Sequence, residues 1–247
     1  MAEEHIGEDK QEQPLVWITG ASSGIGKAIA YTLAAEGKRI VLSSRRLEVL
    51  QEMAKDIREK GGHAAVLQCD VSKEKDIEWA IKSILHTFGE GPDVLINNAG
   101  ISPYQNIEDT TTEIFTEVLN VNLIGNFLCA KAVLPEMIRK GKGVIVQMLS
   151  IASTKAFSGG VAYGASKFGA LGFTNALREE VRGKGIKVVS VMPGATETEA
   201  WSENERAEYH ERMMQPEDIA AAVANILSNP QRMMTEEIVL RPIGGDL

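Results

Sequence analysis

The chain has 247 residues, of which 44% are hydrophobic and 24% are charged, proportions that are ordinary for a globular protein. Its net charge of −8 would repel phosphate backbones, so we expect no nucleic-acid partner. No apolar run approaches the ~20 residues of a membrane span, and we therefore expect no membrane partner either. A chain of this length can bury the core of one α/β domain.

Residues 1–13 are polar and mostly acidic, without the basic start and apolar stretch of a secretory signal, and they predict a disordered tail before a single domain over 14–247. Cys69 and Cys129 lie in apolar or strand-like runs. They are expected to be buried free thiols in a reducing compartment, which favours the cytoplasm. The four histidines are scattered, and no metal site is expected.

Short runs rich in Val, Ile and Leu alternate with stretches of helical periodicity, a pattern typical of a parallel sheet with helical crossovers. The expected strands are Leu15–Thr19, Arg39–Ser43, Ala64–Cys69, Val94–Asn97, Gly143–Leu149, Lys187–Met192 and Glu237–Leu240. The expected helices are Ile25–Glu36, Leu47–Lys60, Glu74–Phe88, Glu113–Arg139, Ala162–Arg182 and Pro216–Leu227. The pattern predicts a Rossmann-type, doubly wound α/β fold with seven parallel strands, helices on both faces, and ligands bound by the loops after the strands.

A glycine-rich loop follows the first expected strand and opens the first helix. Gly20 suits a tight turn, Gly24 a close approach to a ligand, and Gly26 the packing of helix on strand, while the helix N-terminus attracts phosphate. A plain glycine-rich turn is the alternative. The spacing, Gly-x3-Gly-x-Gly, differs from the usual dinucleotide pattern. The residues of this loop that we expect to bind a dinucleotide are Gly20, Ser22, Ser23, Gly24, Ile25 and Gly26.

The run from Thr19 to Gly26 resembles the cofactor loop of the short-chain dehydrogenase/reductases. Two further segments resemble sequence motifs of that family. Asp70-Val71 lies where the family contacts adenine, and Asn97-Asn98-Ala99-Gly100 resembles the family's signature after the fourth strand. The similarity extends from Leu15 to the end of the chain. It implies that Asp70, Val71, Asn98, Ala99 and Gly100 contact the cofactor, although the Asn and Gly residues would also suit a structural turn.

The end of the second expected strand indicates which nicotinamide cofactor is preferred. An enzyme that uses NAD carries an acidic residue there, whereas NADP needs a cation for its 2′-phosphate. This segment reads Ser43-Ser44-Arg45-Arg46, with no carboxylate. We therefore expect NADP(H) to be favoured over NAD(H), with Ser44 and Arg45 as contacts. The alternative is that both arginines simply begin the next helix in solvent.

Tyr163 and Lys167 are four residues apart and share one face of an expected helix. An ammonium beside a tyrosine stabilises its phenolate, which makes Tyr163 a candidate proton donor and acceptor. Ser150 precedes Tyr163 by 13 residues, the separation at which the family carries its substrate-orienting serine, and Ser153 is the competing position. An exposed tyrosine and a solvated lysine are the structural alternative. Leu149 stands where the family usually shows a first serine.

Three further assignments follow from the resemblance. Asn122 corresponds to an asparagine that interrupts a long helix and holds a water linked to the lysine, although a structural hydrogen bond would also explain it. Thr196 or Thr198 corresponds to the contact with the nicotinamide carboxamide, and Thr198 fits the spacing better. Pro193 and Gly194 belong to the cofactor site or only end their strand.

The segment over about 195–214 lies in the position of the family's substrate lid. Its acidic residues include Glu197, Glu199, Glu203, Glu205 and Glu208, which we expect to form a solvated face. The predicted activity is NADP(H)-dependent reduction of a small carbonyl compound, or the reverse oxidation of an alcohol. One alternative is a 3-oxoacyl-[acyl-carrier-protein] reductase, which the acidic lid opposes and for which Arg178 remains available.

A second alternative is a sepiapterin-type reductase, because segments such as Thr154–Phe157 and Met214–Ala220 resemble bacterial members of that group. A non-catalytic NADP(H)-binding redox sensor is the alternative of another class, but it need not retain Ser150, Tyr163 and Lys167 together. The resemblance also implies a homo-oligomer, a dimer or a tetramer. Apolar residues spread widely around the two long expected helices agree with this.

Overall fold

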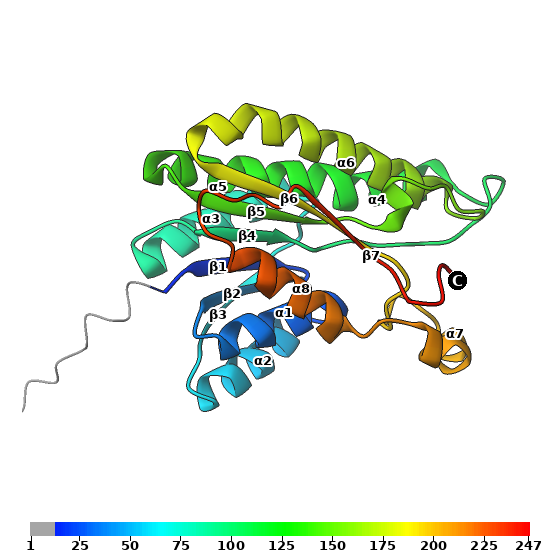
Figure 1. Ribbon diagram of the computed structural model, residues 1–247, viewed down its shortest axis with the longest axis horizontal. Coiled ribbons are helices and arrows are strands. Elements are labelled where there is room, and N and C mark those ends of the chain that lie inside the picture. Colours follow the sequence, from blue (N-terminus) through cyan, green and yellow to red (C-terminus); the bar gives the residue numbers. More distant parts are fainter. Residues whose placement is uncertain (1–12) are drawn as a thin grey trace, which may run out of the picture.

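The computed structural model describes residues 13–247, so the predicted N-terminal tail lies almost entirely outside the described residues. Seven strands and their connecting helices form one α/β unit (Figure 1). The strands are β1 (Leu15–Thr19), β2 (Arg39–Ser44), β3 (His63–Gln68), β4 (Val94–Asn97), β5 (Gly143–Met148), β6 (Ile186–Pro193) and β7 (Glu237–Leu240). The α-helices are α1 (Gly24–Ala35), α2 (Leu47–Glu59), α3 (Glu74–Phe88), α4 (Thr112–Leu119), α5 (Gly125–Lys140), α6 (Val161–Val181), α7 (Glu203–Tyr209) and α8 (Pro216–Leu227).

The sheet has the order β3-β2-β1-β4-β5-β6-β7, and every neighbouring pair is parallel. The chain winds outward from β1 in one direction to β3 and then returns to β4 on the other side. Because this reversal lies between β1 and β4, the loops after these strands diverge and leave a crevice at the carboxyl edge of the sheet. The predicted doubly wound fold is confirmed.

Two apolar cores cover the two faces of the sheet. One contains buried residues of α1, α2 and α8, such as Ile29, Leu50 and Val223. The other contains residues of α3, α5 and α6, such as Ile84 and Val133. Figure 1 shows these helix groups on opposite sides of the strands. Strands buried on both faces explain the nearly unbroken apolar runs in the sequence.

Each predicted strand and helix agrees with the structure to within one residue at either end, apart from one helix. Periodicity alone predicted one helix over Glu113–Arg139, whereas the family resemblance implied an interruption at Asn122, and a π-helical turn, Asn120–Ile124, does separate α4 from α5. The short helix α7, which lies inside the expected lid, was not predicted; Ser202 and Glu205 begin it with a reciprocal capping box.

Within the described residues, one continuous helical stretch, Thr112–Lys140, is long and apolar enough to cross a membrane by length and composition. In its most apolar window, 44% of the residues are buried inside the molecule. The stretch packs against α3, α6 and the sheet. A core helix of a soluble protein passes the same test, so this feature does not by itself indicate a membrane protein.

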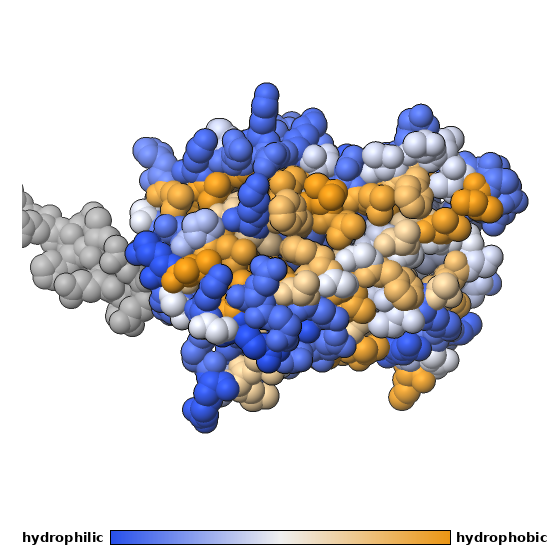
Figure 2. Space-filling model, turned by 90° about the horizontal axis from the view of Figure 1, so that it is seen from above, coloured by the Kyte–Doolittle hydropathy of each residue, from blue (hydrophilic) through white to orange (hydrophobic). Residues whose placement is uncertain are grey.

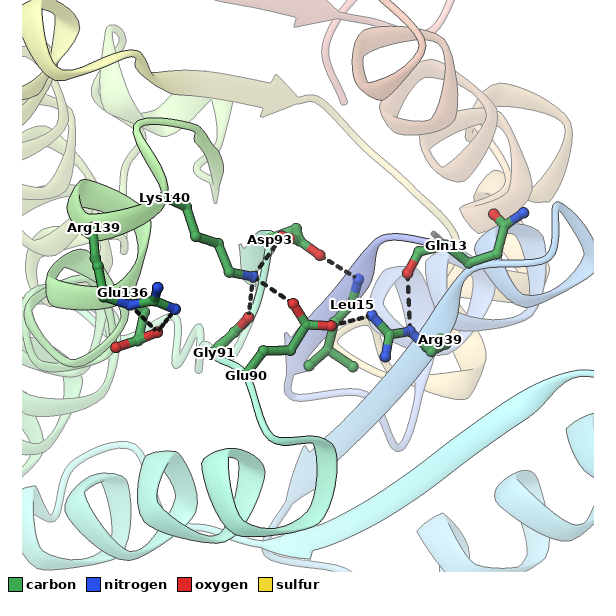
Figure 3. Close-up of polar contacts among 9 residues, drawn as sticks. All are labelled: Gln13, Leu15, Arg39, Glu90, Gly91, Asp93, Glu136, Arg139 and Lys140. Atoms are coloured by element: carbon green, nitrogen blue, oxygen red, sulfur yellow. Dashed lines mark hydrogen bonds and ion pairs between the residues drawn. The ribbon is translucent and has the colours of Figure 1, made fainter. Parts of the chain in front are cut away.

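An ionic network closes the amino edge of the sheet, on the side opposite the crevice (Figure 3). The Lys140 ammonium donates to Glu90 and to Asp93, both at 2.8 Å. Glu90 also accepts from Arg39 at 2.5 Å, and Asp93 accepts from the backbone N–H of Leu15 at 2.9 Å. The network therefore ties the end of α5 to the first residues of β1 and β2.

The two cysteines are free and buried, as predicted. Burial raises the pKa of the Cys69 thiol to about 12 and that of Cys129 well above its ordinary value. Since the thiolate is the reactive form, both thiols are inert near neutral pH. They contribute apolar volume to the core beneath α5.

Candidate functional site

The glycine loop lies in the crevice between β1 and β4. Gly20 and Gly24 have φ values of +63° and +49°, a backbone region that favours glycine. A side chain at Gly20 would also lie 2.8 Å from the Ala99 backbone, and one at Gly26 would lie 2.4 Å from the Asn98 amide. Gly26 was expected to serve the packing of helix on strand; its nearest neighbours are instead Asn98 and the Gly20 carbonyl.

The segment after β4 is fastened to this loop by hydrogen bonds. The Thr19 hydroxyl accepts from the backbone N–H groups of Asn98 and Ala99, at 3.0 and 3.1 Å. The Asn98 side chain donates to the carbonyls of Thr19 and Gly20. Asn98, Ala99 and Gly100 therefore line the crevice together with the glycine loop. Asn97 is directed away from it and bonds the Asn126 carbonyl.

The start of α1 can receive an anion. Its N-cap residue, Ser23, makes no capping hydrogen bond with its side chain, so the first amides of the helix have no partner from it. Uncapped amides and the positive end of the helix dipole suit a phosphate. Together with glycines that allow close approach, these donors fit the pyrophosphate of a dinucleotide.

The two arginines after β2 take different positions. Arg46 donates to the hydroxyls of Ser22 and Ser23, at 3.1 and 2.6 Å, and so lies across the glycine loop. Arg45 lies at a hollow of about 500 Å³ that Asp70 and other residues line. The sequence assigned only Arg45 to the cofactor and gave Arg46 no role. Its position on the glycine loop makes Arg46 a further candidate for binding the cofactor. The doubled arginine after a strand without a terminal carboxylate was the available signal.

Other expected cofactor contacts lie near the same edge. The Ser44 hydroxyl accepts from the Arg46 backbone at 3.1 Å. Asp70 and Val71 follow β3 by two and three residues rather than ending it. The Asp70 carboxylate is held by Ser72, and buried Val71 packs against Gly125.

The structure brings Ser150, Tyr163 and Lys167 to the carboxyl end of β5. Ser150 lies two residues beyond that strand and caps a short 3₁₀ turn by accepting from Ala152 N at 3.1 Å. Its hydroxyl also acts to lower the pKa of the Tyr163 phenol. Lys167 is one helical turn from Tyr163, with its ammonium 5.6 Å from the centre of the phenol ring. The ammonium donates to the Met148 carbonyl at 2.9 Å.

Burial is the main cause of the pKa shifts of Tyr163 and Lys167. It raises the pKa of Tyr163 to about 12, although the Ser150 hydroxyl acts in the opposite direction. It also lowers the pKa of Lys167 to about 8. The pKa of Tyr163 is thus raised, although an adjacent ammonium was expected to lower it, because the loss of water outweighs the opposing hydrogen bond from Ser150.

Asn122 lies in the π-helical turn, and the protein itself satisfies its side chain. The amide accepts from Ile101 N and donates to Ile101 O, both at 2.8 Å, and donates to the Ser166 hydroxyl at 3.0 Å. A side chain at Gly100 would lie 3.3 Å from this amide and 3.9 Å from the Lys167 ammonium. The structural hydrogen bond is present, and Asn122 holds the loop after β4 beside Lys167. The water link stays a prediction.

The expected cofactor contacts at the end of β6 and in the following loop have different surroundings. Pro193 ends the strand, and Gly194 bonds the Leu240 carbonyl at 2.7 Å. Thr196 is buried, with its hydroxyl on the Gly194 carbonyl. The Thr198 methyl lies 3.0 Å from where a side chain at Gly24 would begin. Thr198 therefore covers the glycine loop, and which of the two threonines contacts the nicotinamide carboxamide stays a prediction.

The expected lid is closed at its base by backbone bonds from Glu197 to Met214 and from Met214 to Ala195. Glu197 was expected in a solvated face. It instead accepts from Gln215 at 2.9 Å and contacts His210 at 2.6 Å, so it anchors the lid. Glu205 is likewise engaged, in the cap of α7. Glu199, Glu203, Glu205 and Glu208 are exposed, as expected.

Known proteins are similar in sequence to this chain. Residues 14–209 match the family described as short chain dehydrogenase. The sepiapterin reductase of Chlorobaculum tepidum is 35% identical over 94% of this chain and 98% of its own. An uncharacterised oxidoreductase of Staphylococcus aureus is 32% identical over 92% and 96%.

Solved structures agree with these relatives. An alcohol dehydrogenase from Thermococcus sibiricus, complexed with 5-hydroxy-NADP, has a TM-score of 0.86 at 30% identity and covers 94% of this chain and 97% of its own. A single-residue variant of the actinorhodin polyketide ketoreductase, with NADPH, has the same TM-score, identity and coverage. The chain therefore belongs to the short-chain dehydrogenase/reductase family of oxidoreductases.

Proposed function

We propose that the protein reduces a small carbonyl compound to an alcohol with NADP(H), or catalyses the reverse oxidation, in the cytoplasm. The convergence of Ser150, Tyr163 and Lys167 beside the glycine loop is the observation that supports this most strongly. A non-catalytic sensor would have no need of these three groups in one place.

The dinucleotide, when bound, supplies a hydride to the carbonyl carbon. Tyr163 donates its phenolic proton to the carbonyl oxygen, and the O–H bond of the alcohol forms as that of the phenol breaks. Ser150 orients the same oxygen by a hydrogen bond and stabilises the charge developing on it. Lys167, as an ammonium, stabilises the phenolate that remains. Solvent then restores the proton of Tyr163.

The residues fit NADP(H) better than NAD(H). β2 ends in Ser43 and Ser44 with no carboxylate, and two arginines follow. Arg45 is exposed beside the Asp70 hollow and free to meet a 2′-phosphate, while Arg46 covers the serines of the loop. The 5-hydroxy-NADP and the NADPH bound by the two similar structures support the same choice.

Arg178 cannot serve as the basic surface residue that a reductase acting on an acyl carrier protein would need. Arg178 is only 4% exposed, and its guanidinium donates to Val188 O, Asn175 Oδ1, Ser190 Oγ and Glu236 O. It therefore has no surface to offer to an acidic partner. The similarity to a sepiapterin reductase favours a pterin carbonyl compound as the second candidate substrate.

Self-association is part of the proposal. Figure 2 shows apolar side chains running across the helix layer seen from above. The exposed apolar residues of α5, α6 and the preceding turn are Ile124, Phe127, Ile138, Val161 and Phe168. A continuous apolar face of this kind is more typical of an interface than of a free surface, and we propose that a second copy covers it in a dimer or tetramer.

The first experiment measures initial rates of NADPH and NADH oxidation with ketones, diketones, quinones, sepiapterin and a 3-oxoacyl thioester. Turnover with NADPH that is lost in Tyr163→Phe supports the proposal. NADPH binding without turnover in either direction would favour the sensor instead.

Sedimentation of the wild type beside Phe168→Glu tests the interface, and a wild-type monomer would contradict it.

A further inference from the structure

Tyr104 is an aromatic residue beside the candidate active site to which neither the motifs nor the proposed chemistry gives a role. It lies in the loop between β4 and α4, and its ring centre is 6.0 Å from that of Tyr163, with a tilt of 42°. The residue is 57% exposed, although burial of the phenol group raises its pKa. One part of Tyr104 is therefore packed beside Tyr163 while another part remains accessible.

The protein holds Tyr104 in place through its neighbour. Gln105 donates its backbone N–H to the Gly159 carbonyl at 2.6 Å and pairs with Gly160 in an isolated parallel bridge. This bridge joins the loop after β4 to the loop that leads from Ser150 to Tyr163. The position of the Tyr104 ring is thus coupled to the same segment that carries the reacting groups.

A second aromatic residue borders the same point. A side chain at Gly160 would lie 3.4 Å from Tyr104 Cε1 and 3.9 Å from Phe157 Cβ. Phe157 is partly exposed, and the Lys155 ammonium lies 5.1 Å from its ring centre. Tyr104 and Phe157 therefore flank one glycine next to Tyr163.

We propose that Tyr104 and Phe157 form an aromatic wall of the substrate site, which selects carbonyl compounds with a planar, conjugated ring next to the reacting C=O group. This rests on the proposed function of the site. A ring that stacks on Tyr104 lies beside Tyr163, because the ring centres of the two side chains are 6.0 Å apart. Aromatic faces attract flat rings in offset or tilted arrangements and accommodate puckered, saturated rings less well.

Two diketones of equal carbon number separate planarity from size. We use 1-phenyl-1,2-propanedione and 1-cyclohexyl-1,2-propanedione and measure binding by calorimetry in the presence of NADP⁺, so that no reduction takes place. Wild type is expected to bind the phenyl compound about tenfold more tightly. Tyr104→Leu, which keeps apolar bulk, is expected to lose most of that preference, whereas Tyr104→Phe retains it. Phe157→Leu is expected to lose part of it.

Equal binding of the two diketones by wild type, or an unchanged preference in Tyr104→Leu, would overturn the aromatic wall. Circular dichroism of each variant establishes that it is folded. Turnover with NADPH is measured separately on the same compounds. A protein that binds the phenyl compound selectively but never reduces it keeps the wall and refutes the proposed function. A protein that reduces both without preference refutes only the wall.

Discussion

The Lys167 ammonium lies 5.6 Å from the centre of the Tyr163 ring, one helical turn further along α6. Lys167 is buried and Tyr163 is partly buried, and each is shifted toward its neutral form: the pKa of Tyr163 rises to about 12 and that of Lys167 falls to about 8. The phenol therefore keeps its proton throughout the physiological range, as a proton donor must. The lysine is the group of this pair that changes charge near neutral pH.

This difference predicts the pH dependence of carbonyl reduction. Below pH 8 Lys167 is charged and stabilises the phenolate that forms as Tyr163 gives up its proton. As the pH rises through about 8, the ammonium is lost and kcat is expected to fall, approaching tenfold per pH unit. In Lys167→Arg the guanidinium stays charged (pKa above ~12), so the falling limb near pH 8 should disappear even if the maximal rate is lower. Persistence of that limb in the arginine variant would contradict the assignment to Lys167.

Removal of the Tyr163 hydroxyl is expected to lower kcat about 10²–10⁴-fold, the usual contribution of a positioned acid. Ser150→Ala should also lower kcat, by about 10²-fold or more, because the developing negative charge loses a donor. Ser153→Ala is the control, since Ser153 lies three residues further along the same loop and its buried hydroxyl has no hydrogen-bond partner within the described residues. Single-turnover rates with bound NADPH measure the effect. A Ser153→Ala loss as large as that of Ser150→Ala would mean that the wrong serine was chosen.

The outline of this site could be predicted because its signals are local in the sequence. The glycine loop, the Tyr163–Lys167 spacing and the periodicity of the strands each depend on a few neighbouring residues. The break in the helix at Asn122 could not be derived from periodicity, since a π-helical turn keeps the helical direction and inserts only one extra residue per turn. Its cause is a tertiary contact with Ile101.

Two other features also depend on contacts between distant segments. Arg46 reaches Ser22 and Ser23, more than twenty residues earlier, and no local pattern distinguishes it from Arg45. Glu197 resembles its acidic neighbours in the sequence, but Gln215 and His210 engage it at the base of the lid. Side chains that join two loops were thus the part of the site that sequence reasoning could not place.

The network at the amino edge should affect stability without affecting catalysis (Figure 3). Lys140→Met leaves Glu90 and Asp93 without their shared cation, at side-chain exposures of only 28% and 21%. We expect a loss of about 1–3 kcal/mol in the free energy of unfolding, because partly buried carboxylates lose charged hydrogen bonds. Lys55→Met is the matched control: its ion pair with Glu59 is exposed, and the change should stay within about 0.5 kcal/mol. Urea titration measures both, and an unchanged kcat is expected. Equal stabilities of the two variants would show that the network contributes nothing specific.

The last prediction concerns how Arg45 and Arg46 divide the recognition of NADPH. Arg45 lies beside the hollow that contains Asp70, whereas Arg46 is held on Ser22 and Ser23. Arg45→Ala should therefore raise KM for NADPH about 10–100-fold and leave KM for NADH nearly unchanged, since a single charged hydrogen bond to the 2′-phosphate is lost.

Arg46→Ala should act differently, because it removes a contact within the glycine loop as well as a cation. We expect a rise in KM for both cofactors, larger for NADPH. Lys55→Ala, in the helix that follows Arg46, is the control for the loss of one positive charge from this part of the surface. Steady-state kinetics with each cofactor at saturating substrate distinguish the two arginines. If Arg45→Ala raises KM for NADH as much as KM for NADPH, Arg45 does not bind the 2′-phosphate. Arg46 is then the remaining cation that could bind it.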